Sequence, residues 1–330
     1  MKLVIQIPCY NEEECLPITL KDIPESFSGI DEFEILIIDD GSTDKTIEVA
    51  RNLGIKNFVI NGRNLGLAKA FSKGLNKCLE LNADIIVNLD GDNQYLAKDI
   101  EKLITPIIEN TVDIVIGARP IENIKHFSFA RKAIQKFGSF LVKMVSNQNI
   151  IDATSGFRAF SREAALKINV FSNYTYTLEI IIQASNIGLK IDSVPIRVND
   201  SKLRSSRLIK STFLYTQRAI ISVLRALIIY KPLKFFSIVS LVFIVPGIIF
   251  LIRYLYYYLK QIYGHIPSIV IASFLITFSL IIFIVGIFSH LISINRRILE
   301  DNQYNLRKIF LDLKHKTHFS HLLAENSLIY

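Results

Sequence analysis

The sequence predicts an α/β domain with a mainly parallel sheet, followed by a membrane anchor of two helices. Short β-branched segments alternate with helical ones through the first two hundred residues, which is the pattern of βαβ units with right-handed crossovers. Beyond them, residues 235–252 and 266–289 are uncharged and would form helices of about 27 and 36 Å, long enough to cross a bilayer. A chain of 330 residues has room for one sizeable domain and such an anchor.

Six segments have the apolar composition of buried strands: residues 2–8, 33–38, 56–60, 83–89, 113–117 and 191–198. Helices are expected after the first two of them, and at 67–81, 162–168 and 175–187. Ser42 or Asp44 can cap the second helix. The carboxyl ends of parallel strands share one sheet edge, where open α/β sheets bind ligands.

Acidic residues follow the fourth predicted strand. Asp90 and Asp92 come directly after it, and Gln94 lies two residues further on. Hard divalent cations take oxygen ligands and are usually held by one or two carboxylates together with substrate phosphates. The pair therefore predicts a cation shared with a diphosphate, although acids also collect at strand ends as solvated caps.

Two common nucleotide-binding patterns are absent from the sequence. No G-x-G-x-x-G follows a predicted strand, and there is no G-x-x-x-x-G-K-[ST]. Acids cannot cradle phosphate directly, so those at the strand ends must bind ribose and base, or a metal that binds phosphate. Cys9, Cys15 and Cys78 have no metal-binding spacing and are expected to be reduced thiols.

The net charge of +8 is concentrated beside the apolar stretches. Residues 201–299 contain 12 Lys or Arg and no Asp or Glu, which leaves a charge of −4 on the rest of the chain. A basic surface beside a bilayer indicates anionic headgroups or a phosphorylated lipid. Nucleic acid is not an expected partner, because no nucleic-acid module is recognisable and the basic excess adjoins the spanning segments.

Positive residues flank the pair of predicted spans. Lys231 and Lys234 precede the first and Arg296–Arg297 follow the second, so both termini are expected in the cytosol and the turn at 260–265 on the opposite side. No signal-peptide pattern precedes the first strand, which agrees with a cytosolic domain. We expect a multi-pass integral membrane protein. Its parts are a domain at 1–206, a juxtamembrane helix at 207–232, spans at about 233–258 and 266–292, and a tail at 296–330.

Two further helices have basic stripes. The helix expected over 126–147 fits either the surface of a soluble domain or a membrane interface with its lysines toward headgroups. In the helix expected over 207–230, four basic residues fall within an arc of about 80°, which is typical of an interfacial helix. They are Arg207, Lys210, Arg218 and Arg225. Glu179 lies among apolar residues, either on the solvated side of its helix or buried with a basic partner.

Six motifs occur in order along residues 1–210. They are Pro8-x-Tyr10-Asn11-Glu12, Asp39-Asp40-Gly41-Ser42-x-Asp44-x-Thr46, Asn64-x-Gly66-x-x-x-Ala70, Asp90-x-Asp92-x-Gln94, Gly117-x-Arg119 and Thr154-Ser155-Gly156-Phe157-Arg158. In this order they resemble the motifs of family 2 glycosyltransferases of the polyprenyl-phosphate type, which include dolichyl-phosphate mannose synthases and bacterial polyprenyl-phosphate glucosyltransferases. The processive polysaccharide synthases of the broader family have a Q-x-x-R-W motif, and this chain contains no Trp.

The resemblance implies a fold of the glycosyltransferase A type, with a Rossmann-like mixed sheet, and a role for each set of motif residues. The nucleoside-diphosphate sugar would be bound by Pro8, Tyr10, Glu12, Asp39, Asp40, Asp90 and Asp92. Mg²⁺ or Mn²⁺ would be held by Asp90, Asp92 and Gln94. Phosphates of the donor and of a lipid acceptor would be bound by Arg119, Arg131, Arg204 and Arg207. Asp92, Arg119 and Arg131 would be the catalytic residues, and Arg204 is offset from the family's R-x-x-G-x-S-[KR] stretch.

The activity that this resemblance implies is inverting transfer of a sugar to a membrane polyprenyl monophosphate, undecaprenyl or dolichyl, to make a donor for glycoconjugate or cell-envelope assembly. Such a phosphate has a second pKa of about 6, so it is an anionic nucleophile near neutral pH and needs no strong general base. Two alternatives stay open: transfer to a sugar hydroxyl with Asp152 or Glu179 as base, and a non-catalytic scaffold that keeps the fold. The sequence leaves open the sugar, the nucleotide and whether the chain forms a homo-oligomer.

Overall fold

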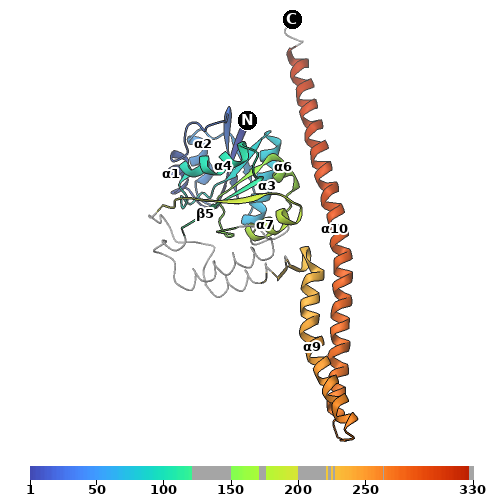
Figure 1. Cartoon of the computed structure of the whole chain (residues 1–330). Coiled ribbons are helices and arrows are strands. Elements are labelled where there is room, and N and C mark those ends of the chain that lie inside the picture. Colours follow the sequence, from blue (N-terminus) through green and yellow to red (C-terminus); the bar gives the residue numbers. More distant parts are fainter. Residues whose placement is uncertain are drawn as a thin grey trace. The chain divides into compact units, whose positions relative to one another are not determined.

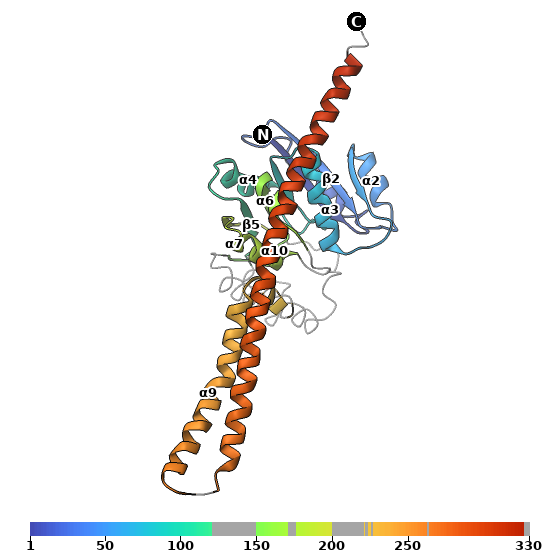
Figure 2. The ribbon, with the colours of Figure 1, turned by 90° about the vertical axis from the view of Figure 1, so that its right-hand side faces the viewer.

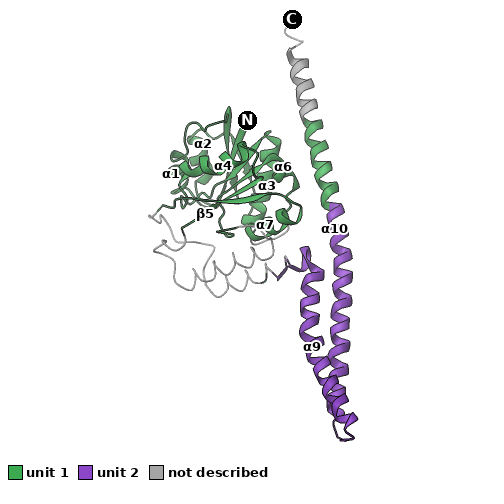
Figure 3. Cartoon of the chain, in the orientation of Figure 1, with its two compact units in different colours: residues 1–223, 300–330 green, residues 224–299 purple. Residues whose placement is uncertain are grey.

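The computed structural model describes residues 1–120, 150–170, 176–199, 221, 224–225, 227–262 and 264–326. Contacts divide the chain into two units, residues 1–223 with 300–330 and residues 224–299 (Figure 3). The predicted helix over 126–147 and most of the one over 207–230 lie outside the described residues, and so do Arg131, Arg204 and Arg207.

Seven strands of the described part of the chain form one sheet in the first unit (Figure 1). Their order across the sheet is β3-β2-β1-β4-β6-β5-β7. The strands are β1 (Lys2–Cys9), β2 (Glu32–Asp39), β3 (Asn57–Ile60), β4 (Ile85–Asn88), β5 (Ile114–Ala118), β6 (Arg158–Ser161) and β7 (Ile191–Pro195). The six predicted strands are all present, with ends that shift by one to three residues.

The strand that sequence reasoning missed is β6. It pairs antiparallel with both β4 and β5, whereas the other neighbouring strands pair parallel. Its four residues, Arg-Ala-Phe-Ser, begin and end with polar side chains and therefore lack the apolar run that identified the other strands. The sheet is consequently mixed, as the family resemblance implied.

Helices cover both faces of this sheet. They are α1 (Leu16–Lys21), α2 (Thr46–Asn52), α3 (Leu67–Glu80), a 3₁₀ turn η1 (Ala97–Asp99), α4 (Ile100–Ile108), α6 (Arg162–Lys167) and α7 (Thr177–Asn186). On one face, Ile5 of β1 lies in a buried apolar cluster with Ile100 of α4. On the other face α3 approaches so closely that a Cβ on Gly74 would lie 2.4 Å from Gln6 Oε1. Alternate residues of β1 therefore form two separate layers of core.

The second unit is built from two long apolar helices. They are α9 (Pro232–Leu259) and the first part of α10 (Ile266–Asn326), which lie side by side in both Figure 1 and Figure 2. Ser240 and Ser279 hydrogen bond across the pair at 2.8 Å, and a Cβ on Gly247 would lie 2.9 Å from Ile276. Each helix contains an 18-residue window with a mean hydropathy of 2.8. By length and composition both could cross a membrane, as predicted.

The helix that contains the second predicted span, α10, continues past residue 292 as far as Asn326. Its residues from Glu300 onward belong to the first unit and pack against α6 and α3 there. Tyr304 Oη lies 3.1 Å from a carboxylate oxygen of Glu163, and Lys314 Nζ lies 2.9 Å from Glu80 Oε2. Arg307 donates to the carbonyl oxygens of Leu166 and Ile168 at the end of α6. Residues 300–314 of the expected tail are therefore helical and contact α6 and α3 of the same unit.

Candidate nucleotide and metal site

Most of the predicted site residues meet at the carboxyl ends of the parallel strands. β1 and β2 run in register, with Cys9 opposite Asp39, so the segments that follow them emerge together. A cavity of about 200 Å³ opens at this edge. It is lined by Pro8, Cys9, Tyr10, Glu12, Asp40, Asn64, Gly66, Leu67, Ala70, Asp90, Gly91 and Asp92. Six of the nine residues predicted to bind the nucleotide sugar are in this set, and two others, Arg204 and Arg207, lie outside the described residues.

Asp90 and Asp92 lie at the cavity on the turn after β4. Burial raises the pKa of the Asp90 carboxyl well above its ordinary value, and the negative charge of Asp92 raises it further. The positive charges of Arg119 and Arg158 act in the opposite direction. Asn93 takes a left-handed conformation with φ of 54°, which allows the chain to turn sharply after the acid pair. A buried carboxylate with a second carboxylate beside it is suited to a divalent cation.

The donor set fits Mg²⁺ or Mn²⁺ that is shared with a substrate. Among the residues that the structure describes, no group of three or more His, Cys, Asp or Glu could hold a metal. Asp90 and Asp92 would therefore need further oxygen ligands, such as an amide, water or diphosphate. Gln94 is a predicted ligand whose backbone is held by Asp92 Oδ1 at 3.2 Å and by Asn199 at 3.0 Å. Its side chain does not line the cavity, so its metal contact remains a prediction.

Asp39 and Asp40 differ in what their carboxylates bind. Asp40 is 5% exposed and accepts hydrogen bonds from the backbone N–H groups of Leu65 and Gly66 at 2.9 and 2.8 Å. It also accepts from Asn61 Nδ2 at 2.9 Å, so it anchors the loop before α3 as well as lining the cavity. Asp39 is almost fully buried and accepts from the N–H of Ser42 at 3.2 Å. It lies at the end of β2 and, among the predicted nucleotide ligands that the structure describes, is the one that does not line the cavity.

Arg119 is buried, and its positive charge acts on Asp90. Its Nε and Nη2 lie 2.6 and 3.1 Å from the two carboxylate oxygens of Asp152, and Nη2 also donates to Thr154 Oγ1 at 2.8 Å. Burial alone would raise the pKa of Asp152, but the charge and hydrogen bonds of Arg119 outweigh it and the pKa is lowered. Asp152 is therefore an ion-pair partner and is poorly placed to act as a general base. The other candidate base, Glu179, lies in α7 and is partly exposed.

Four buried residues near Asp90 were given no role from the sequence: Asn88, Tyr95, Tyr176 and Arg158. Asn88 donates to the carbonyl oxygen of Gly156 at 2.9 Å and to Tyr176 Oη at 3.1 Å. The Gly156 N–H in turn donates to Tyr95 Oη at 3.2 Å. Arg158 was noted within a motif but was given no role. One feature of the sequence could have pointed to this group: Asn88 is a polar residue within the apolar run 85–89.

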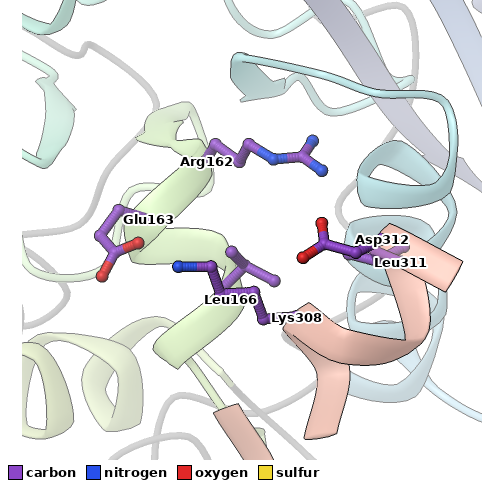
Figure 4. Close-up of a pocket in the computed structure, with 6 residues that line it drawn as sticks. All are labelled: Arg162, Glu163, Leu166, Lys308, Leu311 and Asp312. Carbon is purple, nitrogen blue, oxygen red and sulfur yellow. The ribbon is translucent and has the colours of Figure 1, made fainter. Parts of the chain in front are cut away.

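A second cavity, of about 320 Å³, lies between α6 and the part of α10 that belongs to the same unit (Figure 4). Three residues of each helix line it: Arg162, Glu163, Leu166, Lys308, Leu311 and Asp312. Its two acids and two bases balance in charge, and it contains none of the predicted site residues. The predicted site residues that the structure describes therefore gather at the sheet edge and not at this second cavity.

A mixed sheet with an acid pair beside a cavity at its carboxyl edge defines the class of nucleotide-sugar transferases with a glycosyltransferase A fold. The fold is similar to that of glucosyl-3-phosphoglycerate synthase from Mycobacterium tuberculosis, solved in complex with Mn²⁺, uridine diphosphate and phosphoglyceric acid. The TM-score is 0.51 at 17% identity, over 67% of this chain and 78% of that one. Within the class, the chain belongs to glycosyl transferase family 2, whose model matches residues 4–168.

Relatives in this family come from archaea and bacteria. An uncharacterized protein of Methanocaldococcus jannaschii is 34% identical over 62% of this chain and 85% of its own length. The UDP-N-acetylglucosamine–dolichyl-phosphate N-acetylglucosaminyltransferase of Methanococcus voltae is 32% identical over 58% of this chain and 83% of its own. The undecaprenyl-phosphate mannosyltransferase of Micrococcus luteus is 26% identical over 63% of this chain and 88% of its own.

Proposed function

We propose that this protein transfers a sugar from a nucleoside diphosphate to the phosphate of a membrane polyprenyl monophosphate. The observation that supports this most directly is the Asp90–Asp92 pair beside the sheet-edge cavity, in a chain that also contains two apolar helices of spanning length. Named relatives act on dolichyl and undecaprenyl phosphates. A lipid phosphate acceptor explains why a nucleotide site and a membrane anchor occur together.

The family resemblance, together with the positions of the residues at the cavity, supports the following roles. Pro8, Tyr10 and Glu12 would contact the nucleoside, and Asp90 and Asp92 would hold Mg²⁺ or Mn²⁺, with Gln94 as a further ligand. When bound, the cation would neutralise charge on the leaving diphosphate. Arg119 would contribute positive charge that acts on Asp90 while Asp152 and Thr154 fix its guanidinium. Arg131, Arg204 and Arg207 remain predicted phosphate ligands.

The hydroxyl-acceptor alternative needs a carboxylate base near the sugar. Asp152 is occupied by Arg119, and the lowered pKa makes it a weak base. A phosphate acceptor is already anionic at neutral pH and needs no such base. Transfer to a hydroxyl would therefore depend on Glu179, the other candidate base, whereas transfer to phosphate depends on neither.

The membrane arrangement proposed here places the first unit in the cytosol, with α9 and the apolar part of α10 crossing the bilayer. Lys231, Lys234 and Arg296–Arg297 would lie on the cytosolic side of the two crossings. A prenyl chain leaves the bilayer at a cost of about 0.8 kcal/mol per buried CH₂, so transfer must take place at the headgroup level.

The decisive experiment supplies purified full-length protein in detergent with UDP- and GDP-sugars, Mn²⁺ and either a polyprenyl monophosphate or the free polyprenol of the same chain length. We expect a sugar-phosphate lipid with the monophosphate and no product with the alcohol, as read by mass spectrometry. Transfer to the alcohol, or to a soluble saccharide at a comparable rate, would contradict the proposal in favour of the hydroxyl-acceptor alternative.

A further inference from the structure

We infer that Arg158 is a positioning residue for the metal site, because its buried guanidinium fixes the loop 153–156 against the Asp90 carboxylate. This inference rests on the proposed function, since it assigns Asp90 to a bound cation. Under this inference, metal binding depends on a residue that is not one of the two acids.

The first observation is the environment of Arg158. The side chain is 0% exposed and is the largest fully buried side chain among the described residues. All three guanidinium nitrogens donate to backbone carbonyl oxygens at 2.8 Å: Nε to Ser155, Nη2 to Ala153 and Nη1 to Thr177. In the described part of the chain no carboxylate lies within ion-pair distance of it. Burial lowers the pKa of Arg158 to about 10, which still leaves it protonated at neutral pH.

Burying a charged side chain without a carboxylate partner costs free energy, so each guanidinium nitrogen must find a hydrogen-bond acceptor. The three acceptors belong to two separate segments, the loop 153–156 and the start of α7 at Thr177. Arg158 therefore ties this loop to α7. A lysine would keep the charge but has one nitrogen at the end of a flexible stem, which cannot reproduce a rigid fork across these two segments.

The second observation is the contact between this loop and the acid. A Cβ added to Gly156 would lie 2.8 and 3.0 Å from the two carboxylate oxygens of Asp90. The carboxylate therefore packs directly on the Gly156 backbone. Because Tyr95 and Asn88 bind the N–H and carbonyl groups of Gly156, the loop has little freedom to shift without moving the acid.

These two contacts connect Arg158 to Asp90 through the loop. If the loop loses its tie to α7, the surface on which the carboxylate rests is held by fewer hydrogen bonds, those of Tyr95 and Asn88. Residues that orient a metal ligand in this way typically alter metal affinity by about 10–100-fold when they are replaced. The effect is expected on metal binding itself, before any chemistry.

The test measures Mn²⁺ binding by electron paramagnetic resonance, with purified full-length protein and saturating UDP. We compare wild type with Arg158→Lys and, as a matched control, Arg162→Lys, because Arg162 also donates to a backbone carbonyl, that of Ala83, but away from Asp90. We expect the Mn²⁺ dissociation constant to rise about tenfold or more in Arg158→Lys and to stay within about twofold of wild type in Arg162→Lys. A folded Arg158→Lys protein, by circular dichroism, that binds Mn²⁺ like wild type would overturn the inference.

If Arg158→Lys does not fold, Gly156→Ala tests the same contact without changing the arginine. It should weaken Mn²⁺ binding by a similar factor, and unchanged binding would also overturn the inference. Neither measurement uses the lipid acceptor. Wild type that binds Mn²⁺ and UDP but transfers to no polyprenyl phosphate would refute the proposed acceptor alone, whereas wild type that binds no Mn²⁺ would refute both proposals.

Discussion

Asn88 and Arg158 lie directly opposite each other in the antiparallel pair β4–β6, and both side chains bind the same loop. Asn88 Nδ2 donates to the carbonyl of Gly156 at 2.9 Å, and Arg158 Nε donates to that of Ser155 at 2.8 Å. Two polar residues at one register position, both fully buried, thus hold the loop that supports Asp90. An antiparallel strand inserted into a parallel sheet makes this arrangement possible, because it brings the loop back to the carboxyl end of β4.

Asn88→Ala should lower the free energy of unfolding by about 1–3 kcal/mol, because it leaves the buried carbonyl of Gly156 without its donor. It should also weaken Mn²⁺ binding in the presence of UDP. Denaturant titration and paramagnetic resonance measure the two effects. Asn57→Ala, which removes a hydrogen bond to Glu34 on β2, is the matched control and should leave Mn²⁺ binding unchanged. Equal Mn²⁺ affinity in both variants would argue against a role for Asn88 in the site.

Asp92→Asn should abolish transfer while the protein stays folded, because a neutral amide is a poor replacement for an anionic metal ligand. Excess EDTA should inhibit wild type, and added Mn²⁺ or Mg²⁺ should restore it. Sugar transfer and circular dichroism are the measurements, with the exposed Asp192→Asn as a control expected to keep its activity. Activity of Asp92→Asn within a few-fold of wild type would remove Asp92 from the mechanism.

Asp152→Asn should destabilise the protein by about 3–5 kcal/mol at pH 7, because it leaves the buried Arg119 without its ion-pair partner. The control is Asp31→Asn, which alters a largely exposed ion pair with the N-terminal amine and should change stability by less than about 1 kcal/mol. Denaturant titration measures both differences.

The same ion pair predicts a pH dependence. The pKa of Asp152 is lowered in the folded protein, so its stabilising contribution is present above the unfolded pKa of about 3.9 and is lost as pH falls through the folded pKa. The stability difference between wild type and Asp152→Asn should therefore narrow on acidification below about pH 4. A difference that is constant from pH 7 to pH 3 would mean that this carboxylate does not act through its charge.

Arg307→Met should loosen the end of α6, because Nη1 of Arg307 donates to the Leu166 and Ile168 carbonyls at 3.2 and 3.0 Å. A hydrogen bond to a charged group contributes about 1.5–3 kcal/mol. Amide hydrogen exchange should accelerate in α6, whereas Arg297→Met, an exposed position on the same helix, should leave it unchanged. Unaltered exchange in α6 would show that residues 300–314 do not dock on it in solution.

The proposed topology can be tested with single cysteines, since the three native thiols are buried. Gln261→Cys lies in the turn between α9 and α10, and Asn302→Cys lies on α10 beyond the apolar part. A membrane-impermeant maleimide should label the second from the cytosolic side and the first from the opposite side. Labelling of both from one side would refute the two-crossing arrangement.

The local sequence pattern was sufficient to predict most of the strands and helices and to place the acids at the sheet edge. The parallel strands are short, mainly apolar runs, and the central ones β1, β4 and β5 are buried on both faces. Their β-branched composition is visible without any tertiary information. The ligands at the carboxyl edge follow from strand direction alone, so Glu12, Asp40, Asp90 and Asp92 could be placed together from their positions in the sequence. The two apolar helices follow from the absence of charge over eighteen residues or more.

The tertiary structure decided what the buried polar groups bind. Arg119 and Asp152 are 33 residues apart and Asn88 and Gly156 are 68 apart, so no local pattern relates them. β6 is too short and too polar at its ends to stand out, and only the register of the completed sheet places Arg158 opposite Asn88. Likewise, the charged segment after residue 299 gave no sign of docking, because its partners on α3 and α6 lie 139 to 234 residues earlier. Periodicity reports which face of an element is buried, whereas the partner of a buried hydrogen-bonding group is set by the packing of distant segments.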